Sequence, residues 1–267
     1  MNDSSVTRWL VRKAGAARPC LRLFCVPYAG VGASTYRLWA AGLPAEVEVC
    51  AIQLPGRETR LREKPLDRIP DIVAGLLPEL RPHLDVPFAI FGHSMGAVIA
   101  TELCAALVRE GGPLPLHLFV SGRRAPHLAD PDPSLSHLPD DDFARELNLR
   151  YGGIPAEIMA DRELMALLLP CLRADIAALE NYRPTPLERI GFPLTVYGGT
   201  QDSRAPRIHL EAWQEMAGTE FRVRQFEGTH FYLNPRRVEL LADIAATLAP
   251  LVGSLQKTRA DVPEAVE

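Results

Sequence analysis

Continuous apolar runs, each bounded by turn residues, constrain the fold of this chain more than any other feature. Five of them lie at residues 21–28, 47–56, 87–92, 115–122 and 193–199. Runs that are apolar at every position are typical of parallel strands that are buried on both faces. A sixth run, 221–228, alternates between apolar and polar residues and predicts a strand at the edge of the sheet.

Segments with helical spacing lie between these runs. Apolar residues recur at intervals of three and four over 69–80, and 95–109 is rich in Ala and Leu before a pair of glycines. A third helix is predicted over 235–251, where Asn234 can cap the first turn and Pro235 can take the first helical position. Alternating strands and helices predict the α/β class, with a mostly parallel sheet and helices on both faces.

One long stretch, 123–192, interrupts this alternation, since a plain crossover between two strands needs far fewer residues. It begins with a polar, turn-rich segment and continues into a helical segment over 163–182, which Pro170 is expected to kink or divide. We therefore expect an α/β core formed by 1–122 and 193–253, with an inserted helical lid between the two parts. The polar residues 254–267 are predicted to be a disordered tail.

Composition excludes several classes of protein. The net charge of −4 argues against a general nucleic-acid binder, which would carry an excess of basic residues. No apolar stretch reaches about 18 residues, so no transmembrane helix is expected. The N-terminal segment lacks the apolar centre of a secretory signal peptide, which favours a cytoplasmic protein.

The cysteines agree with that location. Their number is odd, and no C-x-x-C pair occurs. We expect buried free thiols rather than disulfides or a zinc site. The five are Cys20, Cys25, Cys50, Cys104 and Cys171.

A G-x-S-x-G pentapeptide, Gly92 to Gly96, follows the third apolar run and opens the second helix. This is the context of a nucleophile elbow, a tight strand-to-helix turn that projects a serine hydroxyl above the sheet. The pentapeptide alone is only moderately specific, and its position between a strand and a helix makes the signal strong. Ser94 is the predicted nucleophile, and the N–H of Met95 is a predicted oxyanion donor.

A nucleophilic serine needs a base, and the base needs an acid that orients it. In α/β-hydrolases the chain order is serine, acid, histidine. Asp202 follows the strand at 193–199, and His230 follows the strand at 221–228. Taken alone, Asp202 could be a helix or turn cap, and His230 could be a surface loop histidine. Because the three residues end three strands in the required order, Ser94, Asp202 and His230 are the predicted catalytic triad.

The other histidines are poorer candidates for the base, since they precede the acid, lie in the insertion, or fall within a helix. His93 flanks the nucleophile and is expected to pack beside the elbow. No H-E-x-x-H or similar spacing occurs, so no metal site is predicted.

The second oxyanion donor is expected in the loop after the first core strand, residues 27–32. Gly30 and Gly32 allow the backbone there to turn and to approach an oxygen closely. Ala29 is the preferred donor, and Tyr28 is the alternative.

The chain resembles type II thioesterases, the stand-alone editing enzymes of polyketide and nonribosomal peptide assembly lines. The resemblance extends from residue 21 to about 233. It rests on LFCVPYAGVGAS followed by Trp39, QLPGRE, FGHSMGA, SGRRAP, YGGIP, LLPCLRADI…ENY, GGTQD and GTHFYL.

The resemblance implies an α/β-hydrolase fold with a mobile helical lid. It also implies a cofactor-independent hydrolysis of acyl thioesters on the phosphopantetheine of carrier proteins, with the triad on Ser94, Asp202 and His230. The chain has Ser203 where the family often has a second acid, and Gly228-Thr229 where it often has paired glycines. Neither departure removes a member of the triad, so activity is expected.

Two other functions remain open at this point. One is a small-ester hydrolase or acyltransferase with the same triad, which activity on free oxygen esters would reveal. The other is a non-catalytic interaction module that keeps the fold, which failure of a phosphonate to label Ser94 would reveal.

Two features bear on the substrate. An apolar stripe in the insertion either packs on the core or roofs an acyl chamber over Ser94; its members are Leu164, Leu168, Leu172, Ile176 and Leu179.

Arginines also cluster in three site-bearing loops, where they either are solvated surface charges or attract an acidic carrier protein. The predicted carrier-binding residues are Arg204, Arg207, Arg236 and Arg237, with Arg123 and Arg124 nearby.

Overall fold

A seven-stranded sheet forms the centre of the protein in the computed structural model, which describes residues 7–12, 19–185 and 189–260. The strand order is β1-β3-β2-β4-β5-β6-β7. The strands are β1 (Leu10–Arg12), β2 (Leu21–Val26), β3 (Val47–Ile52), β4 (Phe88–His93), β5 (His117–Ser121), β6 (Leu194–Gly199) and β7 (Phe221–Phe226).

All six predicted strands are present, and β2 to β7 pair in parallel. The alternating run is the edge strand β7, as predicted. The sequence analysis missed β1, which pairs antiparallel with β3 at the other edge. A strand of three residues is too short to show either alternation or a continuous apolar run.

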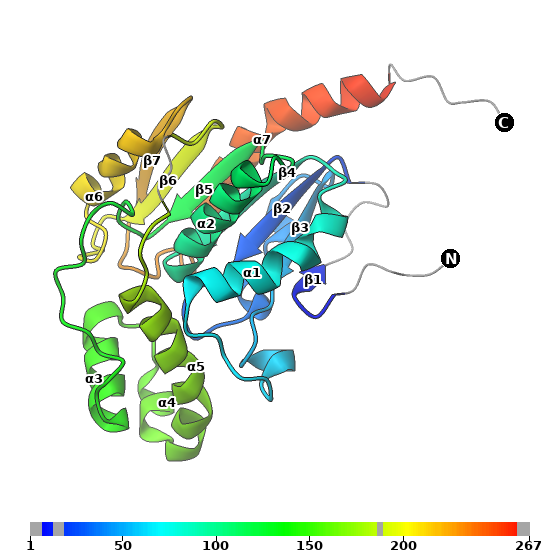
Figure 1. Cartoon of the computed structure of the whole chain (residues 1–267). Coiled ribbons are helices and arrows are strands. Elements are labelled where there is room, and N and C mark those ends of the chain that lie inside the picture. Colours follow the sequence, from blue (N-terminus) through cyan, green and yellow to red (C-terminus); the bar gives the residue numbers. More distant parts are fainter. Residues whose placement is uncertain (1–6, 13–18, 186–188, 261–267) are drawn as a thin grey trace.

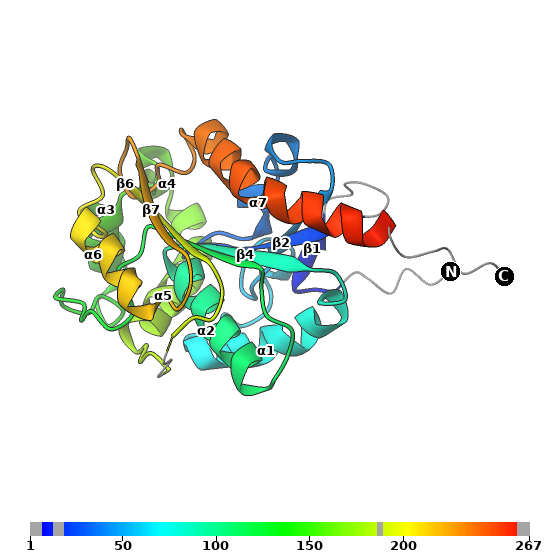
Figure 2. The ribbon, with the colours of Figure 1, turned by 90° about the horizontal axis from the view of Figure 1, so that it is seen from above.

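Helices cover both faces of the sheet (Figures 1 and 2). One face packs against α1 (Ile69–Leu80) and α2 (Met95–Arg109), and also against α6 (Arg207–Glu211). The other face packs against α7 (Arg237–Ala260) and the aromatic residues Tyr36 and Trp39. The α/β class with helices on both faces is therefore confirmed. Short 3-10 helices complete the core: η1 (Ala33–Tyr36), η2 (Ala40–Gly42), η3 (Glu58–Arg60), η4 (Arg81–His83) and η5 (Ala212–Met216).

The last helix differs from its prediction at both ends. It begins at Arg237 rather than after an Asn234 cap, because Pro235 and its neighbours still belong to the turn that follows His230. The expected disordered tail is wrong for residues 254–260, since α7 continues to Ala260, where Leu255 packs on the core and Gln256 bonds Glu46. Residues 261–267 lie outside the described part of the chain.

The segment Arg237–Lys257 within α7 is long and apolar enough to cross a membrane by length and composition alone. Its apolar residues have a partner within the protein, because one side of α7 lies in the core cluster against the sheet. The buried residues are Leu240, Leu241, Ile244, Leu248 and Val252. We therefore describe α7 as a core helix.

Within residues 123–185 and 189–192, which the structure describes, the insertion contains three helices, α3 (Asp140–Tyr151), α4 (Ala156–Ala160) and α5 (Arg162–Glu180). They lie together at one end of the sheet, below it in Figure 1. Asp161 caps α5 by accepting hydrogen bonds from the N–H groups of Glu163 and Leu164. The expected division at Pro170 is wrong, since α5 continues through this exposed residue to Glu180.

Candidate active site

The predicted nucleophile lies in a strained turn between β4 and α2. Ser94 has φ 51° and ψ −112°, a conformation that non-glycine residues rarely adopt. The flanking glycines are sterically required, because a Cβ on Gly92 would lie 2.1 Å from the carbonyl oxygen of Gly96. A Cβ on Gly96 would lie 2.2 Å from the carbonyl oxygen of Val26. The turn therefore has the geometry of a nucleophile elbow.

The three predicted triad residues meet at the carboxyl ends of their strands. His230 Nε2 lies 3.0 Å from Ser94 Oγ, and His230 Nδ1 lies 2.8 Å from Asp202 Oδ2. All three are buried, with exposed fractions of 5%, 4% and 4% for Ser94, Asp202 and His230. Since a carboxylate only accepts hydrogen bonds, Nδ1–H donates to Asp202 and Nε2 is free to accept the Ser94 proton. This arrangement can activate a serine for attack on a carbonyl.

The two predicted oxyanion donors are close to this serine in different ways: Met95 follows it in the chain, and Ala29 lines the cavity that also contains Ser94. Met95 begins α2, and Ala29 lies in the loop after β2. Neither N–H donates a hydrogen bond to any residue that the structure describes. The N–H of Gly30, in contrast, donates to Asp175 Oδ2 at 2.7 Å. The free N–H of Ala29 is compatible with the predicted role, and the choice between Ala29 and Tyr28 stays a prediction.

His93 packs beside the elbow, as predicted, and the hydrogen-bond partner of the Ser94 hydroxyl is His230 rather than His93. Its Nδ1 lies 2.8 Å from Ser121 Oγ, and its ring centroid lies 5.1 Å from that of His230. Burial, and then the charge of His230, lowers the pKa of His93 well below its usual range, so this ring stays neutral. The sequence analysis did not single out Ser121 or Tyr232. The Tyr232 hydroxyl lies 2.6 Å from Ser121 Oγ and extends this chain of hydrogen bonds.

A cavity of about 340 Å³ opens onto Ser94 and His230 and is lined mainly by apolar side chains. The helix α5 contributes four members of the predicted stripe: Leu168, Leu172, Ile176 and Leu179. Two of these, Leu172 and Ile176, also belong to the apolar cluster within the insertion, so the stripe both packs and roofs the cavity. Leu164 is the exception, since it is 44% exposed and does not line the cavity.

The predicted carrier-binding arginines lie in very different surroundings. Arg204 is only 15% exposed and pairs with Asp130 and Asp132, so its charge is already matched within the protein. Arg207 and Arg236 are more exposed and pair with glutamates. Arg237 forms no ion pair within the described part of the chain.

Arg123 and Arg124 are not surface charges. Arg124 is buried and pairs with Asp130, and Arg123 lines a second cavity of about 490 Å³ next to the first. Burial lowers the pKa of Arg123. All five cysteines are buried free thiols, as predicted.

Comparison with known proteins identifies the family. The model of the thioesterase domain matches residues 21–248. The chain belongs to the thioesterase family. It is 41% identical over 238 residues to the gramicidin S biosynthesis protein GrsT of Aneurinibacillus migulanus, which covers 89% of this chain and 93% of that protein. This thioesterase is 34% identical to thioesterase PikA5 of Streptomyces venezuelae, over 89% of this chain and 84% of that protein.

Solved structures resemble the whole described fold of this thioesterase. The type II thioesterase BorB of the borrelidin biosynthetic cluster superposes with a TM-score of 0.82 at 33% identity, covering 92% of this chain and 100% of that chain. RedJ, the prodiginine-pathway thioesterase of Streptomyces coelicolor, superposes with a TM-score of 0.79 at 39% identity, over 88% and 90%. The α/β-hydrolase fold and the resemblance to type II thioesterases are confirmed, and the protein is a thioester hydrolase.

Proposed function

We propose that this thioesterase hydrolyses acyl groups from the phosphopantetheine of carrier proteins and so removes aberrant acyl groups during polyketide or nonribosomal peptide synthesis. The observation that supports it most is a buried chain of hydrogen bonds, Asp202–His230–Ser94, that ends at a largely apolar cavity. The names of the relatives, which place them in such pathways, give the second line of support.

The proposed reaction has two halves. In the first, His230 Nε2 takes the proton of Ser94 while Oγ attacks the thioester carbonyl; the C–S bond then breaks, and the thiol leaves with the proton from His230. In the second, His230 takes a proton from water, the hydroxide attacks the acyl-serine carbonyl, and the carboxylic acid leaves as Ser94 regains its proton. Asp202 holds the imidazole in the required tautomer throughout.

Two backbone donors are proposed to stabilise the negative charge on the carbonyl oxygen. The N–H of Met95 also carries the positive end of the α2 dipole, which favours an anion there. The N–H of Ala29 is proposed as the second donor. No cofactor takes part in this scheme.

The insertion, residues 123–192, is proposed as the lid that encloses the acyl group. Its helix α5 lines the cavity with leucine and isoleucine side chains, which suits an aliphatic chain. We infer a soluble cytoplasmic enzyme that acts on neither nucleic acid nor membranes.

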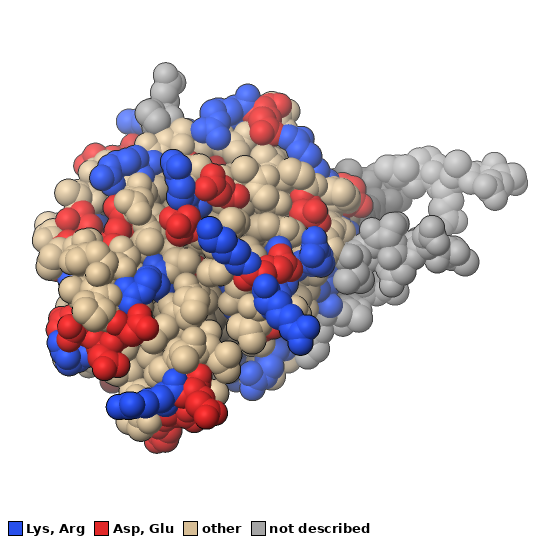
Figure 3. Space-filling model, turned by 60° about the horizontal axis from the view of Figure 1, so that its bottom comes forward, with Lys and Arg blue, Asp and Glu red and all other residues tan. Residues whose placement is uncertain are grey.

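The carrier protein is proposed to dock beside the cavity. Figure 3 shows basic and acidic side chains interspersed on the lid side of the molecule, without one large basic field. Docking is therefore expected to depend on a few exposed arginines, of which Arg207, Arg236 and Arg237 are the proposed ones; Arg204 is held by its own aspartates. Such charges chiefly affect the rate of association.

A substrate panel tests this function. Acyl groups of two to ten carbons are presented on carrier proteins, on N-acetylcysteamine and as oxygen esters of the same acids, with Ser94→Ala as the blank. The proposal expects the highest kcat/KM on carrier-bound thioesters. Equal or faster cleavage of oxygen esters would instead indicate a small-ester hydrolase, and no turnover of any substrate would indicate a non-catalytic module.

A further inference from the structure

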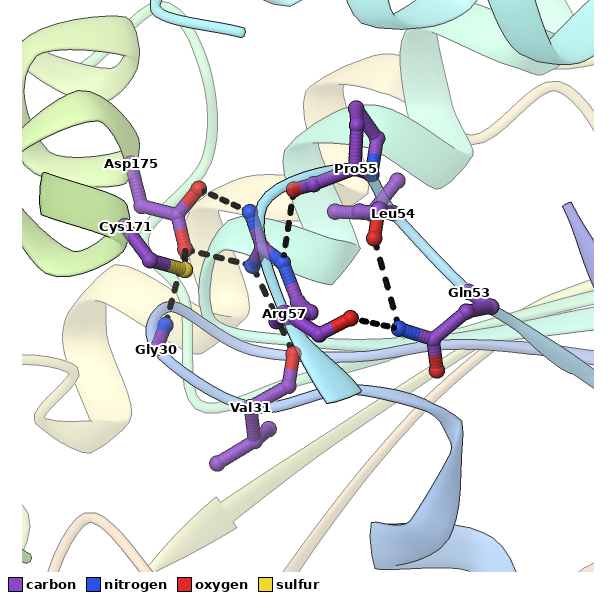
Figure 4. A network of polar contacts seen from close by, with 8 residues as sticks. All are labelled: Gly30, Val31, Gln53, Leu54, Pro55, Arg57, Cys171 and Asp175. Atoms are coloured by element: carbon purple, nitrogen blue, oxygen red, sulfur yellow. Dashed lines mark hydrogen bonds and ion pairs between the residues drawn. The ribbon is translucent and has the colours of Figure 1, made fainter. Parts of the chain in front are cut away.

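A buried ion pair joins the lid to the core beside the active site (Figure 4). Asp175 lies on α5, and Arg57 lies in the loop between β3 and η3. Arg57 Nη1 and Nη2 donate to the two carboxylate oxygens at 2.7 and 2.9 Å. The two side chains are 0% and 5% exposed, so the pair is shielded from water and salt.

The same pair also holds the loop that carries Ala29. Asp175 Oδ2 accepts the N–H of Gly30 at 2.7 Å, and Arg57 Nη1 donates to the carbonyl oxygen of Val31 at 3.4 Å. These contacts fix the backbone on the side of Ala29 that leads away from β2, and the N–H of Ala29 remains free. The ion pair therefore fixes the shape of the loop without occupying the proposed donor.

Arg57 is itself held by the core. Its Nε donates to the carbonyl oxygen of Pro55 at 3.2 Å, and the Gln53 amide donates to the Arg57 carbonyl oxygen at 2.9 Å. Burial lowers the pKa of Arg57, but the charge and the hydrogen bonds of Asp175, with smaller contributions from Cys171 and Glu58, together outweigh this effect, and the pKa lies above its ordinary value. Arg57 therefore stays charged, and the loop after β3 is a fixed anchor for the carboxylate.

On the lid side, residues of α5 next to Asp175 also pack closely against Asp175 itself and against the Ala29 loop. Burial, and then the charge of Asp175, raises the pKa of Cys171 to about 12, so the thiol keeps its proton and lies 3.8 Å from Asp175 Oδ2 as a weak donor. Gly30 has φ +80°, and a Cβ there would lie 2.3 Å from Leu172 Cδ2. The loop is thus bonded to α5 through Asp175 and packed under it through Leu172.

We propose that Asp175 and Arg57 are positioning residues for hydrolysis: they tie the Ala29 loop to the lid helix, so that the second oxyanion donor is correctly placed only while α5 is seated. This inference rests on the proposed function, in which Ala29 donates to the oxyanion. It makes lid closure a condition for catalysis as well as for holding the acyl chain.

A purely structural ion pair would have a different effect, and the protein contains one for comparison. Arg22 and Glu48 are also buried and lie 2.9 Å apart near the amino ends of β2 and β3, whereas the site lies at the carboxyl ends of the strands. Their further partners, Arg12 and Asp85, are more exposed to solvent. Replacing a whole buried pair by apolar residues of similar size is often neutral for stability, whereas removing one partner is strongly destabilising. Matched double variants therefore separate positioning from folding.

The experiment compares Arg57→Met/Asp175→Leu with Arg22→Met/Glu48→Leu in the full chain. Each variant is measured for kcat and KM on a short acyl N-acetylcysteamine thioester, for the rate of Ser94 labelling by a fluorophosphonate, and for its unfolding midpoint. One oxyanion donor is worth roughly 10²–10³ in kcat, so a misplaced donor should cost roughly 10- to 100-fold. We expect that loss in kcat and in labelling for the first variant, with KM changed less than threefold, and no loss in kcat for the second.

The conservative variant Arg57→Lys gives a second measurement if the double variant does not fold. It keeps the charge but loses the two-pronged contact, so a smaller loss in kcat with the fold retained is expected. Wild-type kcat in both Arg57 variants, or equal losses in the Arg22 pair, would overturn the inference. If the wild-type enzyme neither hydrolyses the thioester nor takes up the label, it is the proposed function that fails.

Discussion

Ser94, Asp202 and His230 stand on the ends of three strands of the sheet, whereas the loop that carries Ala29 is held from the other side by the lid helix α5. The first region depends on contacts within the core: both histidine nitrogens find their partners there, and the elbow is fixed by two glycines. The second depends on an insertion that the fold itself does not require. In the proposed mechanism, nucleophilic attack and the first oxyanion donor, Met95, therefore depend on the core, whereas the second donor, Ala29, depends on the contact with the insertion.

Substitutions in the two regions should therefore have different effects on activity and stability. A change in the sheet should affect the triad or the stability of the whole chain. A change at the contact between lid and loop should affect kcat while the triad stays intact. The following predictions test that division, from the largest expected effect to the smallest.

Gly30→Ala should give the largest loss through the lid contact. The new Cβ would meet Leu172 Cδ2 at 2.3 Å, and φ of +80° is unfavourable for alanine, so the loop must shift. We expect kcat to fall roughly 100-fold, the worth of one oxyanion donor. The double variant Gly30→Ala/Leu172→Ala removes the clash and should recover part of the loss. Steady-state kinetics on a short acyl thioester would contradict this coupling if the two variants were equally slow.

His117 in β5 should make the sheet sensitive to acid. Burial, and then the charge of Arg222, lowers the pKa of His117 to about 4, whereas the unfolded value is near 6.5. The unfolded chain therefore binds more protons between these values, and the free energy of unfolding falls as pH drops from 6.5 toward 4. At about 1.4 kcal/mol per unit of pKa, this residue contributes up to about 3 kcal/mol to that fall.

The variant His117→Gln tests this contribution, since glutamine does not titrate and can still bond Thr195, which lies 2.9 Å from His117 Nε2. Urea unfolding at several pH values should give a shallower decline than in the wild type. Some decline should remain, because the pKa of His93 and of His83 is also lowered by burial. Parallel curves for variant and wild type would contradict the assignment.

Leu168→Trp should change the preferred acyl length by filling the cavity. Leu168 lines the cavity, whereas Leu164, one turn earlier on α5, is exposed and does not, so Leu164→Trp is a matched control. We expect kcat/KM to fall roughly tenfold on an eight-carbon acyl group relative to an acetyl group, within the range known for the fit of methylene groups. A similar change in both variants, or an equal loss on both acyl groups, would show that the stripe only packs.

The exposed arginines should give the smallest effect. Arg236→Gln/Arg237→Gln should raise KM for a carrier-bound substrate roughly threefold and leave an N-acetylcysteamine thioester unchanged, because rim charges act mainly on association. The effect should shrink as salt increases. Arg81→Gln/Arg109→Gln changes the net charge equally at exposed positions near the opposite end of the sheet. A KM change of the same size in that control would contradict a docking role for Arg236 and Arg237.

The triad could be predicted because each member is a local feature: a residue that directly follows a strand, in an order that the fold dictates. The loop proposed to carry the second oxyanion donor was chosen by the same local reasoning, and its role stays a prediction. The contact between Asp175 and Arg57 could not, since 118 residues separate the two and neither carries a local signal of pairing. Arg204 likewise looked like a surface charge in the sequence, because Asp130 and Asp132 reach it only through the folded insertion.

The boundaries of the elements were harder to predict than their existence. The edge strand β1 is too short to show a pattern, and α7 extends past residue 254 because contacts of Leu255 and Gln256 with the core stabilise polar residues that look unstructured in the sequence. In both places tertiary contacts, rather than local preference, determine the structure.

The acyl-enzyme on Ser94 tests the central claim most directly. A carrier-bound acyl thioester is mixed with the enzyme, the reaction is quenched in acid within milliseconds to seconds, and the peptide that contains Ser94 is analysed by mass spectrometry. We predict one acyl group on Ser94 during turnover, no acyl group in Ser94→Ala, and a loss of hydrolysis of roughly 10⁴-fold or more in that variant. Acyl transfer to another residue, or more than about a tenth of the wild-type rate in Ser94→Ala, would contradict the account.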